Sequence, residues 1–157
     1  MHTWFECKIR YEKTMENGMN KKVTEPYLVD ALSFTEAEAR IIEEMTPFIS
    51  GEFTVSDIKR ANYSELFPCE EEAADRWFKC KLVFITLDEK SGAEKKTSTQ
   101  VLVQAADLRD AVKKLDEGMK GTMADYQIGM VSETPLMDVY PYSAEPNDKP
   151  EFDPSKA

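Results

Sequence analysis

The chain contains one uncommon pentapeptide in two places, and this repeat constrains the fold more than any other feature. Residues 4–8 read WFECK and residues 77–81 read WFKCK. Trp and Cys are both scarce in this chain, with two and three copies in 157 residues. A double match of scarce residues at one spacing indicates an internal repeat, and such repeats are best sought before any other pattern.

An offset of 73 or 74 residues extends the match over most of both halves. Apolar residues face apolar residues at alternate positions of the strand-like parts and at helical spacing between them. The matched segments are 4–11 with 77–84, 27–31 with 101–105, and 53–68 with 126–141. The sequence therefore predicts a duplicated unit.

Each half predicts the same order of elements. A period-two strand from Trp4 to about Lys13 leads through Asn17-Gly18 into a second strand over 23–31. The counterpart of that hairpin turn is Ser91-Gly92. A helix then begins after Ser33, with Glu36 completing a capping-box pattern, and Asp107 is the corresponding cap in the second half.

The apolar spacing in the first helix predicts that one of its faces is buried. A third strand follows this helix. Apolar residues at helical spacing form that face: Phe34, Ala37, Ile41 and Met45. The third strand begins near Phe53, and a short extended piece covers 63–67. The order β-β-α-β thus occurs twice.

The predicted fold class is α+β. We expect two pseudo-two-fold-related repeats sharing one core, each an antiparallel sheet covered by one helix, because a three-stranded sheet with one helix buries little surface alone. The expected boundaries are 1–68 for the first repeat, 69–76 for an acidic linker, 77–142 for the second repeat and 143–157 for a disordered acidic tail containing Pro.

Charge and hydropathy make nucleic-acid and membrane partners less expected. The formal net charge is −10, and half of it lies in the segments 69–76 and 143–157. An acidic balance weakens the case for a nucleic-acid partner without excluding a local basic face. No apolar run is long enough to span a bilayer. The N-terminal residues lack a signal-peptide pattern, so we expect a cytoplasmic protein.

The two faces of the repeated strand suggest different roles. Phe5, Cys7 and Ile9 share the face expected to pack on the helix, which makes Cys7 and Cys80 small buried hydrophobes. The opposite face carries the candidate binding residues Trp4, Lys8, Arg10, Trp77, Lys79 and Lys81.

Two interpretations fit these indoles and cations. They resemble a stacking platform for single-stranded nucleic acid. Alternatively, each Trp fills a contact between repeats while Lys and Arg stems pack over it. The solvent exposure of Trp4 and Trp77 discriminates between the two.

Catalytic and metal-binding patterns are missing from the sequence. It contains no nucleophile elbow, phosphate-binding loop or HExxH motif, and its single histidine is His2. The three cysteines lack the spacing of a zinc site. We therefore predict no catalytic residues, no metal, no cofactor and no enzyme activity.

With both repeats considered, the chain resembles a bacterial domain-of-unknown-function family. The resemblance rests on WFECKIRYEKT, EPYLVDALSFTEAEA and FTVSDIKRANYSELFP. It implies a small protein of gut anaerobes and their phages, and it supplies no catalytic or ligand residues.

Three functions are open at this point. The first is a non-catalytic interaction or regulatory module that binds another protein, as expected from small sheets with open edges. The second is a single-stranded nucleic-acid binder. The third is a small-molecule sensor with a site between the repeats. We expect no membrane partner, and a homo-oligomer stays open.

Overall fold

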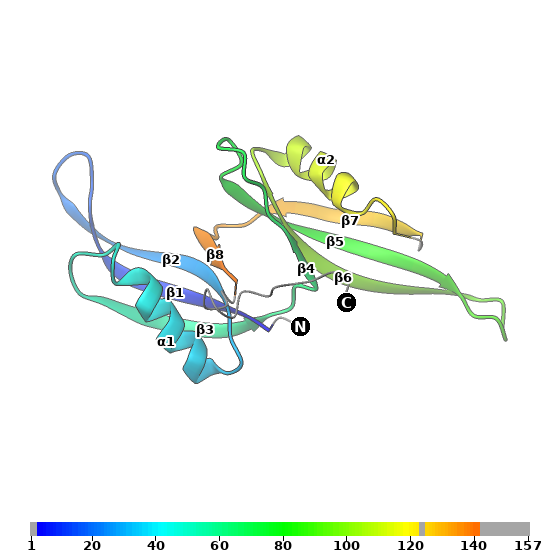
Figure 1. Cartoon of the computed structure of the whole chain (residues 1–157), viewed down its shortest axis with the longest axis horizontal. Helices are drawn as coiled ribbons and strands as arrows, with labels where there is room; N and C mark the ends of the chain where they lie inside the picture. The colour runs from blue at the N-terminus through cyan, green and yellow to red at the C-terminus, as the bar shows by residue number, and fades with distance from the viewer. Residues whose placement is uncertain (1–2, 123–124, 142–157) are drawn as a thin grey trace, which may run out of the picture. The chain divides into compact units, whose positions relative to one another are not determined.

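The computed structural model describes residues 3–122 and 125–141. The predicted tail at 143–157 lies outside these residues. The chain divides into two compact units: unit 1 combines residues 1–61 with 138–157, and unit 2 comprises residues 62–137. Each unit is built from one four-stranded sheet and one helix (Figure 1).

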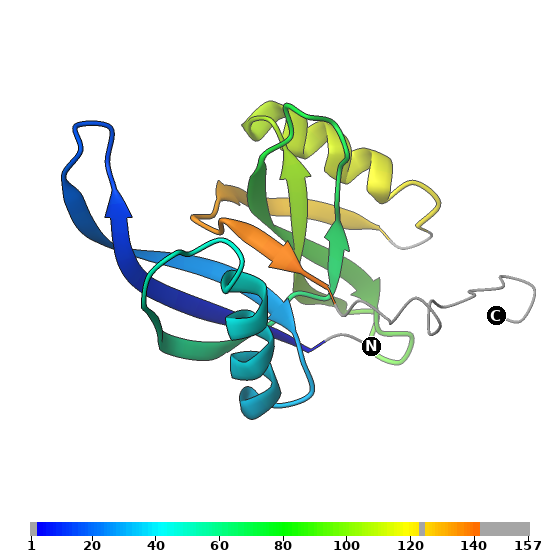
Figure 2. The same cartoon turned by 60° about the vertical axis from the view of Figure 1, so that its left-hand side comes forward.

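Unit 1 begins with a long hairpin, and a helix covers one face of its sheet (Figure 2). The strand order is β3-β1-β2-β8, in which β8 runs parallel to β2 and the other neighbours are antiparallel. The elements of unit 1 are β1 Trp4–Thr14, β2 Asn20–Asp30, α1 Phe34–Met45, β3 Phe53–Ala61 and β8 Asp138–Tyr140.

Unit 2 has the same plan, with sheet order β4-β6-β5-β7 and β4 parallel to β6. Its elements are β4 Glu65–Phe67, β5 Arg76–Leu87, β6 Glu94–Ala105, α2 Leu108–Gly118 and β7 Tyr126–Glu133. The described residues are thus mixed α and β, with strands in the majority.

Local sequence signals explain the turns and helix starts. Gly18 and Gly92 adopt φ of 82° and 70° in the hairpin turns, a conformation that glycine tolerates without strain. The Ser33 hydroxyl accepts from the Glu36 N–H at 3.1 Å, and Asp107 accepts from the Asp110 N–H at 2.8 Å. Both predicted caps are confirmed.

The two hairpins have matching registers and matching bulges. Cys7 lies opposite Tyr27 in unit 1, and Cys80 lies opposite Val101 in unit 2. The pairing of β1 with β3 shifts after Lys8, and the pairing of β5 with β7 shifts after Lys81. These registers give a residue-by-residue correspondence between the units.

The helix-facing buried side chains form one cluster in each unit. Buried side chains of unit 1 pack against α1, and those of unit 2 pack against α2, as two separate clusters. The core strand face is as predicted, with Phe5, Cys7 and Ile9 fully buried. Each helix thus completes the core of its own sheet.

The position of Phe34 corrects a prediction from the sequence. Its helical spacing predicts a place in the core, but it is 48% exposed. Its ring lies edge-on to Phe5 at 4.9 Å between centroids, and the Arg60 guanidinium lies 6.0 Å from its centroid. It sits at the first position of α1, so it covers the rim of the core, while Ala37, Ile41 and Met45 fill the core itself.

The compact units also divide the chain differently from the boundaries expected at 68 and 77. The short strand β4 precedes Pro68 in sequence but belongs to the sheet of unit 2, and β8 belongs to the sheet of unit 1. The segment 69–76 contacts α2, because Lys114 Nζ pairs with Glu71 Oε2 at 2.9 Å. It is therefore part of unit 2.

Candidate functional site

The two predicted stacking residues are buried. Trp4 and Trp77 are 3% and 5% exposed. The backbone of Trp77 is also fixed, because its carbonyl accepts hydrogen bonds from the Thr134 N–H and hydroxyl, both at 2.9 Å. A nucleic-acid base needs an open π-face to stack. Neither indole offers one in this structure.

The predicted cations are more accessible than the indoles. Lys8 and Lys79 are half-buried, whereas Arg10 and Lys81 are exposed. Lys8 and Arg10 share one face of β1, and Lys79 and Lys81 share the corresponding face of β5. Each sheet thus carries a short basic row on the side away from its helix.

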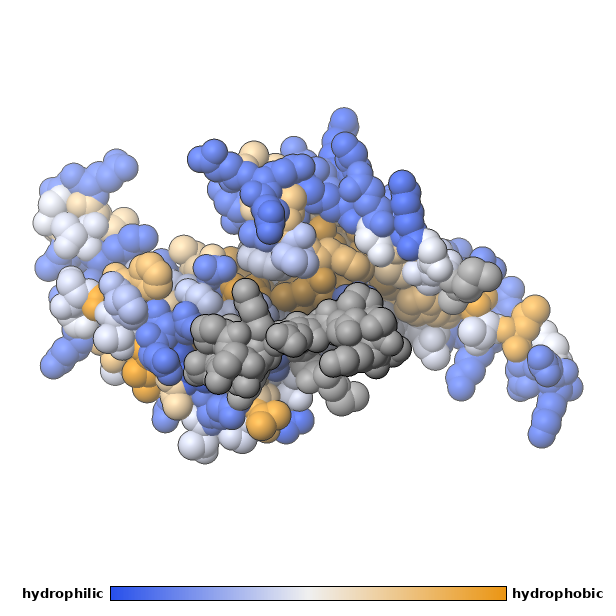
Figure 3. Space-filling model, in the orientation of Figure 1, coloured by the Kyte–Doolittle hydropathy of each residue, from blue (hydrophilic) through white to orange (hydrophobic). Residues whose placement is uncertain are grey.

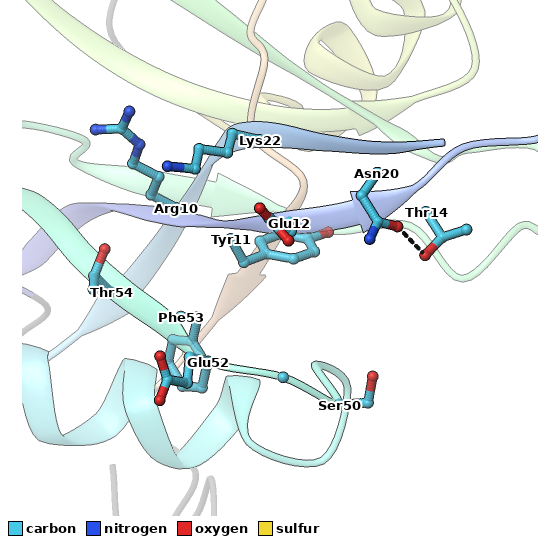
Figure 4. A pocket seen from close by; sticks show the side chains of 11 residues that line it. Arg10, Tyr11, Glu12, Thr14, Asn20, Lys22, Ser50, Glu52, Phe53 and Thr54 are labelled. Atoms are coloured by element: carbon cyan, nitrogen blue, oxygen red, sulfur yellow. Dashed lines mark hydrogen bonds between the residues drawn. The ribbon is translucent and has the colours of Figure 1, made fainter. Parts of the chain in front are cut away.

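Arg10 lines a groove of about 800 Å³ in unit 1. The groove lies where β1 continues beyond the start of β3, and the loop before Phe53 forms its other wall. In Figure 4, Arg10 and Lys22 extend from neighbouring strands, and the Thr14 hydroxyl donates to Asn20 Oδ1 at 2.9 Å.

The groove has the character of a binding surface. Its charged side chains are two cations, Arg10 and Lys22, and two carboxylates, Glu12 and Glu52. All four are exposed, and the pattern of charge is mixed. Such a lining provides hydrogen bonds and weak ion pairs, and it contains no nucleophile beside a base.

The outer edge of unit 2 carries fewer charges than the equivalent edge of unit 1. Strand β3 presents Asp57, Lys59 and Arg60 at its sheet edge, and β7 has Met130, Ser132 and Glu133 at the equivalent positions. Charged residues on edge strands protect against pairing with other chains. Within the described residues, β5 is the only sheet neighbour of β7.

Before each bulge, the charged residues that face these edge strands across the ladder are paired with opposite charges in unit 1 and with uncharged residues in unit 2. In unit 1, Lys8 lies opposite Asp57, and Glu6 forms an ion pair with Lys59 at 3.7 Å. In unit 2, Lys81 lies opposite Met130, which is 42% exposed, and Lys79 lies opposite Ser132. Neither Lys79 nor Lys81 forms an ion pair with any residue in the described ranges.

The surface of unit 2 reflects this composition. Figure 3 shows hydrophilic side chains over α2 and hydrophobic side chains along the strands below it, where β5 and β7 lie in the view of Figure 1. Ile128 and Val131 of β7 pack on the core and are still partly exposed. We call the outer edge of Tyr126–Glu133 the β7 edge.

A separate polar cluster lies on the helix-facing side of unit 1. The Glu25 carboxylate, on a residue 9% exposed, accepts from the Tyr11 hydroxyl at 2.8 Å and from the Tyr27 hydroxyl at 3.3 Å, both on Oε1. The rings of Tyr27 and Tyr140 are stacked, 6.2 Å apart and 22° from parallel. Lys13 Nζ lies 3.6 Å from Glu25 Oε2. We call these five residues the Tyr–Glu cluster.

The cluster holds its tyrosines in the neutral form. Burial, together with the hydrogen bond to Glu25, raises the pKa of Tyr11 to about 12. Burial and the charge of Glu25 also raise the pKa of Tyr27. Burial raises the pKa of Tyr140 to about 12, with smaller contributions from Asp138 and Glu44. These hydroxyls therefore act as hydrogen-bond donors and not as bases.

The equivalent positions in unit 2 carry no such cluster. In the two hairpins, Glu25 lies opposite Ile9, and Thr99 lies opposite Leu82. In the short parallel strands β8 and β4, Tyr140 pairs with Val29, and Phe67 pairs with Val103. The residues of unit 2 that correspond to Tyr11, Glu25, Tyr27 and Tyr140 are Phe84, Thr99, Val101 and Phe67. The buried carboxylate is specific to unit 1.

The side chains of Cys7 and Cys80 do not have the character of nucleophiles. Cys7 and Cys80 are fully buried. Burial raises the pKa of the Cys7 thiol to about 12 and that of the Cys80 thiol to about 11. A thiolate is needed for attack or for metal binding. No group of three or more potential ligand side chains in the described part of the chain could hold a metal ion.

Sequence reasoning missed the β7 edge and the Tyr–Glu cluster. Both lie where the two halves differ in sequence. Met130 aligns with Asp57, and Glu25 aligns with Thr99. Matching residues reveal a repeat, whereas these two features lie at mismatches between the halves. A search for charge changes between aligned positions would have pointed to both places.

Comparison with known proteins places most of the chain in one sequence group. A family model described as a domain of unknown function, DUF4494, matches residues 3–142. No curated protein and no solved structure matches the chain. The helices in the described ranges are too short and too polar to cross a membrane.

Proposed function

This chain belongs to the domain-of-unknown-function family DUF4494, and we propose that it is a non-catalytic module that binds another protein. An extended segment of the partner pairs with the β7 edge. Addition of a strand to an open sheet edge is a common mode of peptide recognition, in which backbone hydrogen bonds supply affinity and side-chain contacts supply specificity.

The observation that carries this proposal is the difference between two equivalent edges. Both edge strands have the same register and the same bulge, but only β3 presents charges of both signs along its length. Position 57 is Asp in β3, and the equivalent position 130 is Met, 42% exposed, in β7. An edge with few charges is suited to pairing with another strand, and the only charged residue of β7 is Glu133, at its end.

The side chains beside β7 indicate the chemistry of the partner segment. Lys79 and Lys81 lie on β5 without a carboxylate opposite them. An incoming strand would pair with β7 and lie two strands from β5, close enough for long lysine side chains to reach acidic residues on this face. Apolar residues on its other face would lie beside Ile128. We therefore expect an extended segment that alternates acidic and apolar residues.

The test uses peptides, because a segment that binds this edge can be selected from a random library while the partner is still unidentified. A displayed library of extended nine-residue peptides is enriched on the full chain, and the affinity of a selected peptide is measured by fluorescence anisotropy. Met130→Asp copies the residue of β3 onto β7. We expect it to weaken binding at least about 10-fold, because like charges meet across the new strand pair.

Asp57→Asn in β3 is the matched control, and it should leave the affinity unchanged. Hydrogen exchange should show the bound peptide protecting amides of β7 and not those of β3. The proposal is contradicted if no peptide is enriched, or if Met130→Asp binds as tightly as the wild type.

The nucleic-acid alternative has lost its aromatic component in this structure. Its remaining support is the pair of basic rows, Lys8 with Arg10 and Lys79 with Lys81. The test of the nucleic-acid alternative is whether an oligonucleotide binds at low salt with an affinity that falls steeply as the salt concentration rises. The small-molecule sensor, with its site between the repeats, also stays a proposal, and thermal-shift screening against metabolites tests it.

Duplication of an ancestral unit is part of the same proposal. Its support is the equal order of elements, the equal hairpin registers, and the bulges at Lys8 and Lys81. A pseudo-two-fold relation between the repeats, a cytoplasmic location and an origin in bacteria or their phages stay predictions from the sequence.

A further inference from the structure

We propose that the Tyr–Glu cluster of unit 1 is a binding site for an alkylammonium group. The site is distinct from the β7 edge and does not depend on the function proposed above. Glu25 supplies the anion. Tyr11 and Tyr27 donate hydroxyl hydrogen bonds to it, and the ring of Tyr140 stacks on that of Tyr27.

The carboxylate of Glu25 has unused capacity to accept hydrogen bonds. Oxygen Oε1 accepts from both Tyr11 and Tyr27, whereas Oε2 has only Lys13 near it among the described residues. The distance to Lys13 Nζ is 3.6 Å, which is beyond a normal hydrogen bond, and the Lys13 side chain is 48% exposed. A ligand cation can therefore replace Lys13 at Oε2.

The buried carboxylate of Glu25 distinguishes unit 1 from unit 2. Burying a carboxylate is unfavourable unless it is paired and hydrogen-bonded. Unit 2 builds the same part of its sheet with Thr99, beside Phe84 and Val101, and needs no charge there. The same part of the sheet therefore forms in unit 2 without a carboxylate. In unit 1 the carboxylate is paired and hydrogen-bonded within the sheet, and it marks a chemical difference between the units that a ligand cation can use.

The residues around Glu25 match the chemistry of an alkylammonium group. Such a group offers donors for the free lone pairs of Oε2 and a positive charge that is attracted to the faces of tyrosine rings. Tyr11, Tyr27 and Tyr140 are each half-buried, so their rings retain accessible surface. The raised pKa of Tyr11 keeps its hydroxyl protonated beside the carboxylate. The ammonium can belong to a free amine or to a lysine side chain of a protein.

Two probes separate these sources. The full chain, labelled with ¹⁵N, is titrated by NMR with cadaverine in one arm and with Nα-acetyl-lysine methylamide in the other. We expect saturable shifts confined to amides of residues 11–13, 23–25, 27 and 140. Binding of cadaverine assigns the site to free amines, and binding of the lysine derivative alone assigns it to a lysine side chain. Absence of binding in both arms at about 10 mM overturns the proposal.

Two variants give opposite expected effects. Glu25→Gln removes the charge and should weaken binding at least about 10-fold, as for loss of a charge-assisted hydrogen bond. Lys13→Ala removes the competing cation and should tighten binding about two- to five-fold, the range of a surface ion pair. Lys13 is exposed, so this second variant tests the site without threatening the fold.

Glu43→Gln is the matched control, because Glu43 is an exposed carboxylate of α1 that lies outside both the groove and the cluster. It should bind the probe as the wild type does. The proposal fails if Glu25→Gln retains the affinity of the wild type, if Lys13→Ala binds more weakly, or if the shifts lie outside β1, β2 and β8.

Discussion

At the scale of single residues, chemical character follows position in the sheet. The repeated Cys residues are fully buried in both units, which confirms their interpretation as small hydrophobes. The repeated Trp residues are buried as well, on the face opposite the helix. Sequence alone does not decide this, because alternation assigns a residue to a face but not the exposure of that face.

The buried thiols and tyrosines predict that the protein loses stability in alkali. The folded chain raises the pKa of Cys80 from 9.0 to about 11 and that of Tyr11 from 10.0 to about 12. Between these values the unfolded chain has released protons that the folded chain retains, so the free energy of unfolding falls as pH rises. Full stability should persist below about pH 9, and urea unfolding at pH 8 to 11 measures the decline.

Cys80→Ala should flatten this decline between pH 9 and 11, because it removes one group that ionises only in the unfolded chain. Cys69→Ala is the control, since Cys69 lies outside both cores. An equal pH slope in Cys80→Ala and the wild type would contradict the assigned role of burial.

At the scale of elements, most predictions from the sequence are confirmed. Both hairpins, both helices and both long third strands occur where alternation and capping placed them. These elements depend on local signals such as Asn17-Gly18 and Ser33 with Glu36, which act within a few residues. The prediction for Phe34 is wrong, because its helical spacing matches the core while its position at the start of α1 leaves it at the rim.

The junction of α2 with β4 depends on a residue without a side chain. A Cβ on Gly118 would lie 2.8 Å from the Phe67 ring. Alanine favours helix by about 1 kcal/mol over glycine, but overpacking costs about 1–3 kcal/mol. We therefore expect Gly118→Ala to lower the free energy of unfolding by about 1 kcal/mol in urea titrations.

Phe67→Leu provides the test of mechanism for this junction. In the Phe67→Leu protein, the smaller side chain leaves room for the added methyl group. Gly118→Ala should therefore lower the free energy of unfolding less in that protein than in the wild type. A stabilising effect of Gly118→Ala in the wild type would show that the ring moves freely and that the contact has no consequence.

At the scale of the whole molecule, the chain crosses between units twice. Strand β4 leaves the first half of the sequence to join β6, and β8 leaves the second half to join β2. Each crossing strand has three residues, too few for a periodic pattern to reveal its sheet. The boundaries at 68 and 77 follow the sequence repeat, whereas the compact units follow strand pairing.

Removal of β8 should therefore weaken the unit that contains the N-terminal strand. Truncation after Met137 takes away the buried Val139 and the stacked Tyr140. We expect unit 1 to lose about 2–4 kcal/mol of stability, as for deletion of large buried side chains. Hydrogen exchange should speed up at Leu28 and Val29 of β2.

Truncation after Pro141 is the matched control, because it keeps β8. Its exchange at β2 should equal that of the full chain. Suppose that truncation after Met137 speeds hydrogen exchange more in β6 than in β2. This result would place β8 in the sheet of unit 2 and contradict its pairing with β2.

The sequence by itself determined the α+β class, the order of elements that occurs twice, and which strand face packs on each helix. These features follow from hydrophobic periodicity and capping, which act over a few residues and are readable in one dimension. Tertiary structure decided the exchange of β4 and β8, the burial of Trp4 and Trp77, and the Tyr–Glu cluster. Each of these depends on which distant segments meet, and three-residue strands or one buried carboxylate carry no local pattern that specifies the partner.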